Sequence, residues 1–172
     1  MIKNLIPQDT VSFIVKSYNL KYETFIPAKL DEAWDFFTSP LNLVKITPPD
    51  MNFVVTSEYN PTDKVYPGMI ITYFVSPLFG IKLRWMTEIT HVKEKEYFVD
   101  EQRFGPYALW HHQHHFKPVE GGIIMTDIVN YAIPYGFLGR IANAVFVRKK
   151  LKQVFSFREK AVVHLFGGTK VK

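Results

Sequence analysis

The feature that most constrains the fold is a series of strand-like segments that ends in one long helix. Strands are predicted at residues 20–26, 51–58, 69–76, 81–92, 96–103, 109–118 and 123–131. Two short helices, at 30–39 and 41–46, follow the first strand. Apolar residues recur at three- and four-residue steps from about Leu138 to Phe166, which predicts the long helix. A sheet of this size must cover its apolar face, and only this helix is long enough. We therefore expect an α+β fold, a curved antiparallel sheet wrapped around the C-terminal helix.

The most informative single stretch is FGPYALWHHQHHF, residues 104–116. In an extended strand, alternate side chains share one face of the sheet. One face then carries two aromatic residues with two histidines between them, namely Trp110, His112, His114 and Phe116. Such a face is unusual for an ordinary core, and it suits a cavity that needs apolar walls with a few polar groups.

The glycine-rich turn at 120–122 indicates which residues of the next strand share that face. A two-residue loop pairs even positions of one strand with odd positions of the next. The face of Trp110 then continues through Met125, Asp127, Val129 and Tyr131. A loop at 120–121 and a loop at 121–122 both give this shared face. A turn at 120–121 sets His114 directly opposite Asp127, whereas a three-residue loop breaks the assignment.

The same reasoning gives one inward face for the other strands. In the hairpin 81–103 the opposite face carries charges that can pair across strands and belong in water. The predicted ligand-binding set, taken from all the strands that line the expected space, is Ile70, Thr72, Phe74, Trp85, Thr87, Asp100, Gln102, Trp110, His112, His114, Asp127, Val129 and Tyr131.

Composition narrows the class of protein. The chain has 172 residues, which is the size of a single domain with a substantial core, and 16% of them are aromatic. It contains no cysteine, so disulfides, thiolate nucleophiles and cysteine-bound metals are excluded. No serine lies in a glycine-flanked elbow and no phosphate-binding loop is present, so the sequence offers little for nucleophilic catalysis or phosphoryl transfer.

The formal net charge of +5 comes mainly from the last third of the chain. We interpret these cations as the solvated face of the helix; contact with anionic lipid headgroups at a membrane surface is the second reading. No nucleic-acid motif accompanies them, so no nucleic-acid partner is expected. No apolar run approaches the ~20 residues of a membrane span. The start, MIKNLIPQDT, lacks the design of a signal peptide, so a cytoplasmic location is expected.

Three roles remain open for His112 and His114. They could be a general acid/base pair oriented by Asp100 or Asp127, they could hydrogen-bond a ligand, or they could bond an inward carboxylate and fix the strand register. The catalytic candidates are His112, His114 and Asp127. Two histidines two positions apart can share a metal ion, but too few ligands converge here, and we expect no metal and no cofactor.

Several longer stretches are also distinctive: IPAKLDEAWDFFTSPLNLVKITPP, LRWMTEIT, FVDEQRFGPYALWHHQHHF, TDIVNYAIPYGFLGR and RKKLKQVFSFRE. Over about residues 18–166 they resemble the START-like helix-grip superfamily, and within it the bacterial polyketide cyclase/dehydrase-like (SRPBCC) ligand-binding branch. The W-x-H-x-H-x-F string at 110–116 and the D-x-V-x-Y-x-x-P string at 127–134 are its most specific parts. The resemblance implies a deep hydrophobic cavity between the sheet and the C-terminal helix. Members bind lipids, hormones, polyketides or quinones, and only some are catalysts.

We therefore expect residues 18–172 to form a single ligand-binding domain, with residues 1–17 as an N-terminal extension. The predicted function is non-catalytic binding, for transport or sensing, of a hydrophobic small molecule such as a lipid, polyketide or quinone. One alternative is an aromatase/cyclase or dehydratase that uses inward His and Asp residues as acid and base. The other is a module that binds a membrane or a partner protein. An open cavity favours binding, whereas a filled interior with an exposed apolar patch favours the module.

Overall fold

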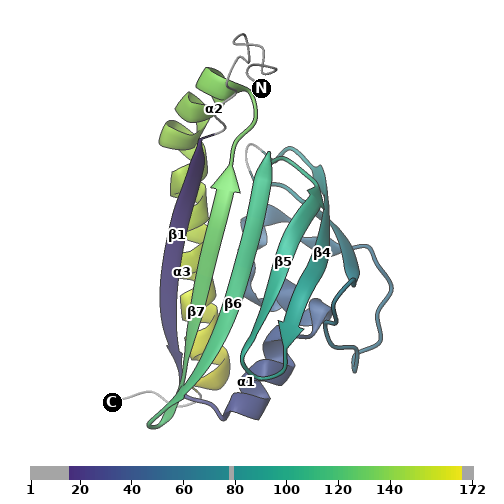
Figure 1. The fold of residues 1–172 in the computed structure, drawn as a ribbon, viewed down its shortest axis with the longest axis vertical. Helices are drawn as coiled ribbons and strands as arrows, with labels where there is room; N and C mark the ends of the chain where they lie inside the picture. The colour runs from purple at the N-terminus through teal and green to yellow at the C-terminus, as the bar shows by residue number, and fades with distance from the viewer. Residues whose placement is uncertain (1–15, 78–79, 168–172) are drawn as a thin grey trace, which may run out of the picture.

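A computed structural model describes residues 16–77 and 80–167 (Figure 1). The first half contains β1 (Ser17–Ile26), α1 (Leu30–Phe37), the 3-10 turns η1 (Pro40–Ile46) and η2 (Pro49–Met51), β2 (Val54–Val55) and β3 (Ile70–Val75). The second half contains β4 (Leu83–Lys93), β5 (Tyr97–Phe104), β6 (Leu109–Val119), β7 (Gly122–Ala132), α2 (Gly136–Ala142), η3 (Asn143–Val147) and α3 (Arg148–Phe166). The predicted N-terminal extension falls mostly on residues 1–15, outside the described part, and Ser17 already begins β1.

The strands form one antiparallel seven-stranded sheet in the order β1-β7-β6-β5-β4-β3-β2. The first strand therefore pairs with the last one. Figure 1 shows α3 running along one face of the sheet, behind β1 and β7, with α1 near the lower end of the same face. This arrangement confirms the predicted α+β architecture, in which a curved sheet holds a long C-terminal helix and two short helical elements follow the first strand.

Two apolar clusters hold the helices against the sheet. In the first, Trp34 of α1 packs edge-on against Phe116 of β6, with ring centroids 5.3 Å apart. In the second, Leu151 and Phe155 of α3 pack against Val129 and Tyr131 of β7, and all four are buried. Burying large apolar side chains stabilises a fold by about 1.5–3 kcal/mol each, so these clusters fix the positions of both helices on the sheet.

The β6–β7 hairpin has one of the two registers that the sequence allows, and both place the same residues on one face. Val119 pairs with Gly122, so the loop is Glu120-Gly121. Gly121 has a φ of 76°, a left-handed conformation that glycine adopts at no steric cost. The pairing sets His114 directly opposite Asp127.

The predicted strand over 51–58 is wrong for most of its length, because only Val54–Val55 belong to β2. Asn52 has a φ of 44° and ends η2 in a left-handed conformation, so the chain turns where an extended segment was expected. Beyond β2, the Ser57 hydroxyl accepts a hydrogen bond from the Thr72 backbone N–H (2.7 Å), which replaces a backbone pairing.

The predicted long helix is one helical run from Gly136 to Phe166, interrupted by the π-helical turn η3 at Asn143–Val147. Asn143 is buried, and its Oδ1 accepts a hydrogen bond of 3.0 Å from the Tyr131 hydroxyl. This bond ties the helix to β7 at the point where its hydrogen-bond pattern changes.

Candidate functional site

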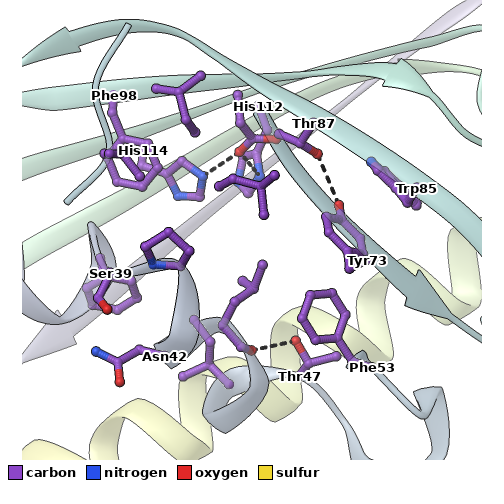
Figure 2. Close-up of a pocket in the computed structure, with 18 of the residues that line it drawn as sticks. Ser39, Asn42, Thr47, Phe53, Tyr73, Trp85, Thr87, Phe98, His112 and His114 are labelled. Carbon is purple, nitrogen blue, oxygen red and sulfur yellow. Dashed lines mark hydrogen bonds and ion pairs between the residues drawn. The ribbon is translucent and has the colours of Figure 1, made fainter. Parts of the chain in front are cut away.

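A cavity of about 160 Å³, partly open to solvent, lies between the inner face of the sheet and the helices (Figure 2). Its walls come from α1, η1, η2, β3, β4, β5, β6 and α3, and most of its surface is apolar. The polar side chains that line it are Ser39, Asn42, Thr47, Tyr73, Thr87, Asp100, His112, His114 and Arg158. An apolar cavity of about 150 Å³ is large enough to take up benzene. The space therefore accepts about one aromatic ring, and a larger molecule would extend through the open side.

Aromatic side chains make up the β4 end of the cavity. Trp85 stacks on Tyr73 with ring centroids 5.8 Å apart, and it meets Trp110 edge-on at 5.4 Å. The hydroxyl groups of Tyr73 and Thr87 are hydrogen-bonded at 3.1 Å (Figure 2). Burial raises the pKa of Tyr73 well above its ordinary value, so this phenol stays neutral. The wall thus offers flat apolar faces and neutral hydroxyls.

The opposite wall comes from the short helical elements, and none of its residues belongs to the predicted ligand-binding set. Phe36 and Phe37 of α1, Leu43 of η1 and Phe53 after η2 all line the cavity. The Phe36-Phe37 pair is the signal that could have shown this wall. Two adjacent large aromatics at the end of an amphipathic helix widen its apolar face beyond a single stripe.

Two histidines and two aspartates form a closed polar cluster, which we call the His–Asp ring: Asp100, His112, His114 and Asp127. His112 Nε2 lies 2.8 Å from Asp127 Oδ1, and its Nδ1 lies 3.4 Å from Asp100 Oδ2. His114 Nε2 lies 2.9 Å from Asp100 Oδ2, and its Nδ1 lies 3.0 Å from Asp127 Oδ1. The last contact is not aligned as a hydrogen bond. Each imidazole thus bridges both carboxylates, and the two rings lie 3.8 Å apart.

Strand register explains why these four side chains meet. Asp100 lies directly opposite His112 across β5 and β6, and Asp127 lies directly opposite His114 across β6 and β7. The two shortest contacts nevertheless run diagonally, from His112 to Asp127 and from His114 to Asp100. Diagonal neighbours on one face are within reach of long side chains. The pleat therefore assembles the ring from three adjacent strands.

The ring is strongly coupled electrostatically. Burial opposes ionisation of Asp100 and Asp127, but His112 and His114 outweigh it and hold the pKa of both carboxyls far below the usual range. Burial likewise lowers the pKa of His112, yet the two carboxylates outweigh it and raise the pKa above its ordinary value. The lowered pKa of the carboxyls and the raised pKa of His112 have the same cause, which is ion pairing between the imidazole and the two carboxylates.

Arg158 adds a cation to this end of the cavity. It projects from α3, its side chain is 12% exposed, and its Nη1 lies 3.5 Å from Asp127 Oδ1. Its guanidinium also lies over the Phe155 ring at 5.1 Å. The sequence predicts a solvated face for the cations of this helix, and Arg158 departs from that prediction because it lines the cavity.

Part of the predicted ligand-binding set lines the cavity: Trp85, Thr87, Asp100, Trp110, His112 and His114. The β3 residues were assigned to the wrong face. Ile71 pairs with Thr87 and Tyr73 with Trp85, so the odd-numbered residues face inward. Ile70, Thr72 and Phe74 therefore lie on the outer face, where Ile70 is 42% exposed. A slip of one residue in a strand moves every side chain to the other face, and no short hairpin anchors β3 in the sequence.

The remaining predicted residues share the inner face but do not line the cavity. Asp127 is buried behind the histidines as part of the ring. Val129 and Tyr131 belong to the apolar cluster under α3. The side chain of Gln102 donates to the Tyr107 carbonyl (2.7 Å) and accepts from the Tyr107 N–H (3.2 Å), so it holds the Gly-Pro turn. Being on the inward face is thus necessary but not sufficient for lining the cavity.

Among the described residues, one group is spaced to hold a metal ion: Asp100, His112 and His114, whose ligand atoms lie within 4.8 Å of one another. A metal would have to replace the contacts that join both histidines to carboxylates, and it would lie near the Arg158 cation. The donor set suits zinc, but each of its histidines already contacts both carboxylates of the ring.

Comparison with protein families gives no match, and no curated protein matches in sequence. Solved structures do resemble the chain. Protein Ms6760 from Mycobacterium smegmatis superposes with a TM-score of 0.65 at 18% identity, over 88% of this chain and 92% of that one. The major latex-like protein 151 of Panax ginseng gives 0.64 at 13% identity, over 87% and 97%. A START superfamily protein from Mycobacterium smegmatis gives 0.62 at 11% identity, over 87% and 97%. The chain therefore has the START-like helix-grip fold.

Proposed function

We propose that the protein binds a lipophilic small molecule in the cavity between sheet and helices, for transport or sensing. The observation that carries this proposal is the cavity itself, with apolar walls and a few polar groups gathered at the His–Asp ring and at Tyr73–Thr87. Pockets of this composition are the usual sites of small-molecule binding. Lipids, polyketides and quinones are the candidate ligands, and a cytoplasmic location is part of the proposal.

Two neighbouring residues on β3 supply a matched test. Ile71 is 5% exposed and lines the cavity, whereas Ile70 is 42% exposed on the outer face. Ile71→Trp places an indole in the cavity, and Ile70→Trp places the same group in solvent. We expect the neutral fluorescent probe N-phenyl-1-naphthylamine to bind the wild type and Ile70→Trp alike, and to bind Ile71→Trp at least about tenfold more weakly, a loss of ~1.4 kcal/mol. Equal binding by both folded variants, or no binding by the wild type, would contradict the proposal.

An acid/base enzyme is the second candidate, because His112 and His114 both line the cavity and both contact carboxylates. A general acid or base must also present a nitrogen to its substrate. Every imidazole nitrogen of the pair lies within 3.4 Å of a carboxylate oxygen. Proton transfer to a ligand would require the ring to open, so the geometry favours binding.

Contact with an anionic membrane surface is a further proposal, and exposed residues near the start of the C-terminal helical run support it. These are Phe137, Leu138, Ile141 and Val145, each at least 45% exposed, which we call the α2 patch. Figure 1 shows α2 projecting beyond the ends of the strands. No acidic residue occurs between Ile128 and Arg158, while Arg140 lies within the patch and Arg148 and Lys149 follow it. Apolar residues flanked by cations are typical of helices that lie on anionic bilayers. None of the described helices is both long and apolar enough to cross a membrane.

Vesicle binding tests this contact. We expect binding to vesicles of phosphatidylcholine with phosphatidylglycerol, and weaker binding to phosphatidylcholine alone or in high salt. Leu138→Glu should weaken binding about tenfold. The leucine side chain gains transfer free energy when it enters the bilayer, and the glutamate does not. Val54→Glu, at a 53% exposed position on β2, is the control and should bind like the wild type. Equal binding by both variants would contradict the role of the α2 patch.

A further inference from the structure

We propose that the ligand is an apolar carboxylic acid, or a molecule with an equivalent anionic oxygen, and that Arg158 binds its anionic group inside the cavity. This inference rests on the proposed function and names the class of molecule that the cavity takes. It depends on the hydrogen-bonding capacity of Arg158, on the partners that Asp127 already has, and on the apolar walls.

Arg158 has hydrogen-bond donors that the protein does not use. A guanidinium carries five N–H donors. The one hydrogen bond that the described residues give Arg158 is the 3.5 Å contact from Nη1 to Asp127 Oδ1. Arg158 Nε is buried and has no hydrogen-bond partner among those residues. A buried charged donor without a partner costs free energy, and an acceptor brought by a ligand removes that cost.

Asp127 does not serve as a dedicated partner for Arg158. The same oxygen, Oδ1, already lies 2.8 Å from His112 Nε2 and 3.0 Å from His114 Nδ1, both shorter than its distance to the guanidinium. A dedicated Arg–carboxylate pair is usually bidentate, with two short N–H···O bonds. The single long contact leaves the planar fork of Arg158 available to a second carboxylate.

The surroundings hold the guanidinium where a ligand can reach it. Phe155 lies beneath it at 5.1 Å, and both residues project from α3. Arg158 lines the same cavity as the apolar walls formed by Phe37, Ile71 and Trp85. A small hydrophilic anion would leave those walls in contact with water. A molecule with an apolar body and one anionic oxygen covers the apolar walls and also gives the Arg158 guanidinium an acceptor.

A pair of probes that share one skeleton separates this inference from the proposed function. N-phenyl-1-naphthylamine is neutral, and 1-anilinonaphthalene-8-sulfonate adds a single anionic group. We expect the wild type to bind the anion more tightly than the neutral probe. Arg158→Met should weaken the anion at least about tenfold, the value of a charged hydrogen bond, and leave the neutral probe within about twofold. Lys160→Met removes an exposed cation from the same helix and should change neither affinity.

The outcomes are distinct. If Arg158→Met binds both probes as the wild type does, or loses both equally, the anion role of Arg158 is overturned while the cavity remains a ligand site. If the wild type binds neither probe, the proposed function fails and this inference fails with it. Arg158→Gln keeps a polar side chain beside Asp127 and serves as the second variant should Arg158→Met not fold, with the same tenfold loss of the anion expected.

Discussion

The two faces of β6 carry the same residue types in different surroundings. On the inner face His112 and Asp127 have side chains only 5% and 3% exposed, and they bond at 2.8 Å. On the outer face His111 and Glu101 also bond at 2.8 Å, but each is 28% exposed. The outer chain of contacts continues through Gln113 to His115. Alternation along one strand thus places one histidine pair in the interior and the other beside solvent.

The comparison shows that burial, rather than pairing distance, decides what a histidine–carboxylate contact contributes. A partly exposed pair is screened by water and contributes little. A buried pair loses its hydration on folding, so removing one partner leaves an uncompensated charge. The inner pair should therefore dominate stability and its pH dependence, and the outer face should contribute less to both.

The largest expected effect is on stability. Asp127→Asn keeps the shape of the side chain but removes the charge that holds the His–Asp ring together. We expect it to lower the free energy of unfolding by about 3–5 kcal/mol, the cost of breaking a buried ion pair. Glu101→Gln on the outer face should cost about 0–1 kcal/mol. Urea denaturation measures both, and similar losses for the two variants would show that burial does not separate the faces.

The pH dependence of stability should have opposite signs on the two faces. The raised pKa of His112 means that its contribution is complete below about pH 6.5 and is lost as pH rises through the folded-state pKa. Burial lowers the pKa of His115, so its contribution is present above about pH 6.5 and is lost as pH falls. In the wild type the free energy of unfolding should decline at alkaline pH, and His112→Gln should remove this decline. The wild type should also show a smaller decline at acidic pH, which His115→Gln should remove. Unfolding curves from pH 5 to 9 measure this, and parallel profiles would contradict it.

The lowered pKa values of Asp100 and Asp127 predict a further loss of stability at acidic pH. Their contribution is complete above about pH 4, the ordinary carboxyl value, and is lost as pH falls toward the folded-state values. Wild-type stability should fall steeply below pH 4. In Asp127→Asn the fall should be shallower, since one of the two carboxyls no longer titrates, and an unchanged slope would count against ion pairing in the ring.

The smallest expected effect is on ligand affinity. Replacing both His112 and His114 with Gln keeps a donor and an acceptor at each position, so N-phenyl-1-naphthylamine should bind within about fivefold of the wild type. The outer double variant, with Gln at 111 and 115, should bind unchanged. An acid/base enzyme would instead lose turnover of its natural ligand by about 10²–10⁴-fold in the inner variant, with binding kept. Conversion of a co-purified ligand by the wild type alone would favour that alternative.

Sequence patterns were sufficient where a short turn fixed the strand pairing. The two-residue loop determined the faces of β6 and β7 and placed His114 near Asp127. The diagonal bond from His112 to Asp127 did not follow from it, because side-chain packing decides which diagonal forms. The face of β3 could not be obtained in this way, because no short hairpin ties Ile71 to its neighbours along the chain. The prediction there was wrong by one residue.

The other wall of the cavity and Arg158 depend on tertiary packing that periodicity does not show. Phe36 and Phe37 widen the apolar face of α1, but which surface that face covers is decided by the placement of α1 over the sheet. Arg158 and the exposed Lys160 are both cations of the same helix, two positions apart. The packing of α3 on the sheet determines that Arg158 lines the cavity and Lys160 does not. Local pattern therefore predicted the sheet, and packing between distant segments determined which residues line the site.

Native mass spectrometry of the protein purified from its own cells tests the central claim most directly. The account predicts that the wild type and Ile70→Trp carry a bound small lipophilic molecule, visible as added mass, and that Ile71→Trp does not. Wild type at the mass of the chain alone, or a ligand retained equally by Ile71→Trp, would contradict the claim that this cavity is the binding site.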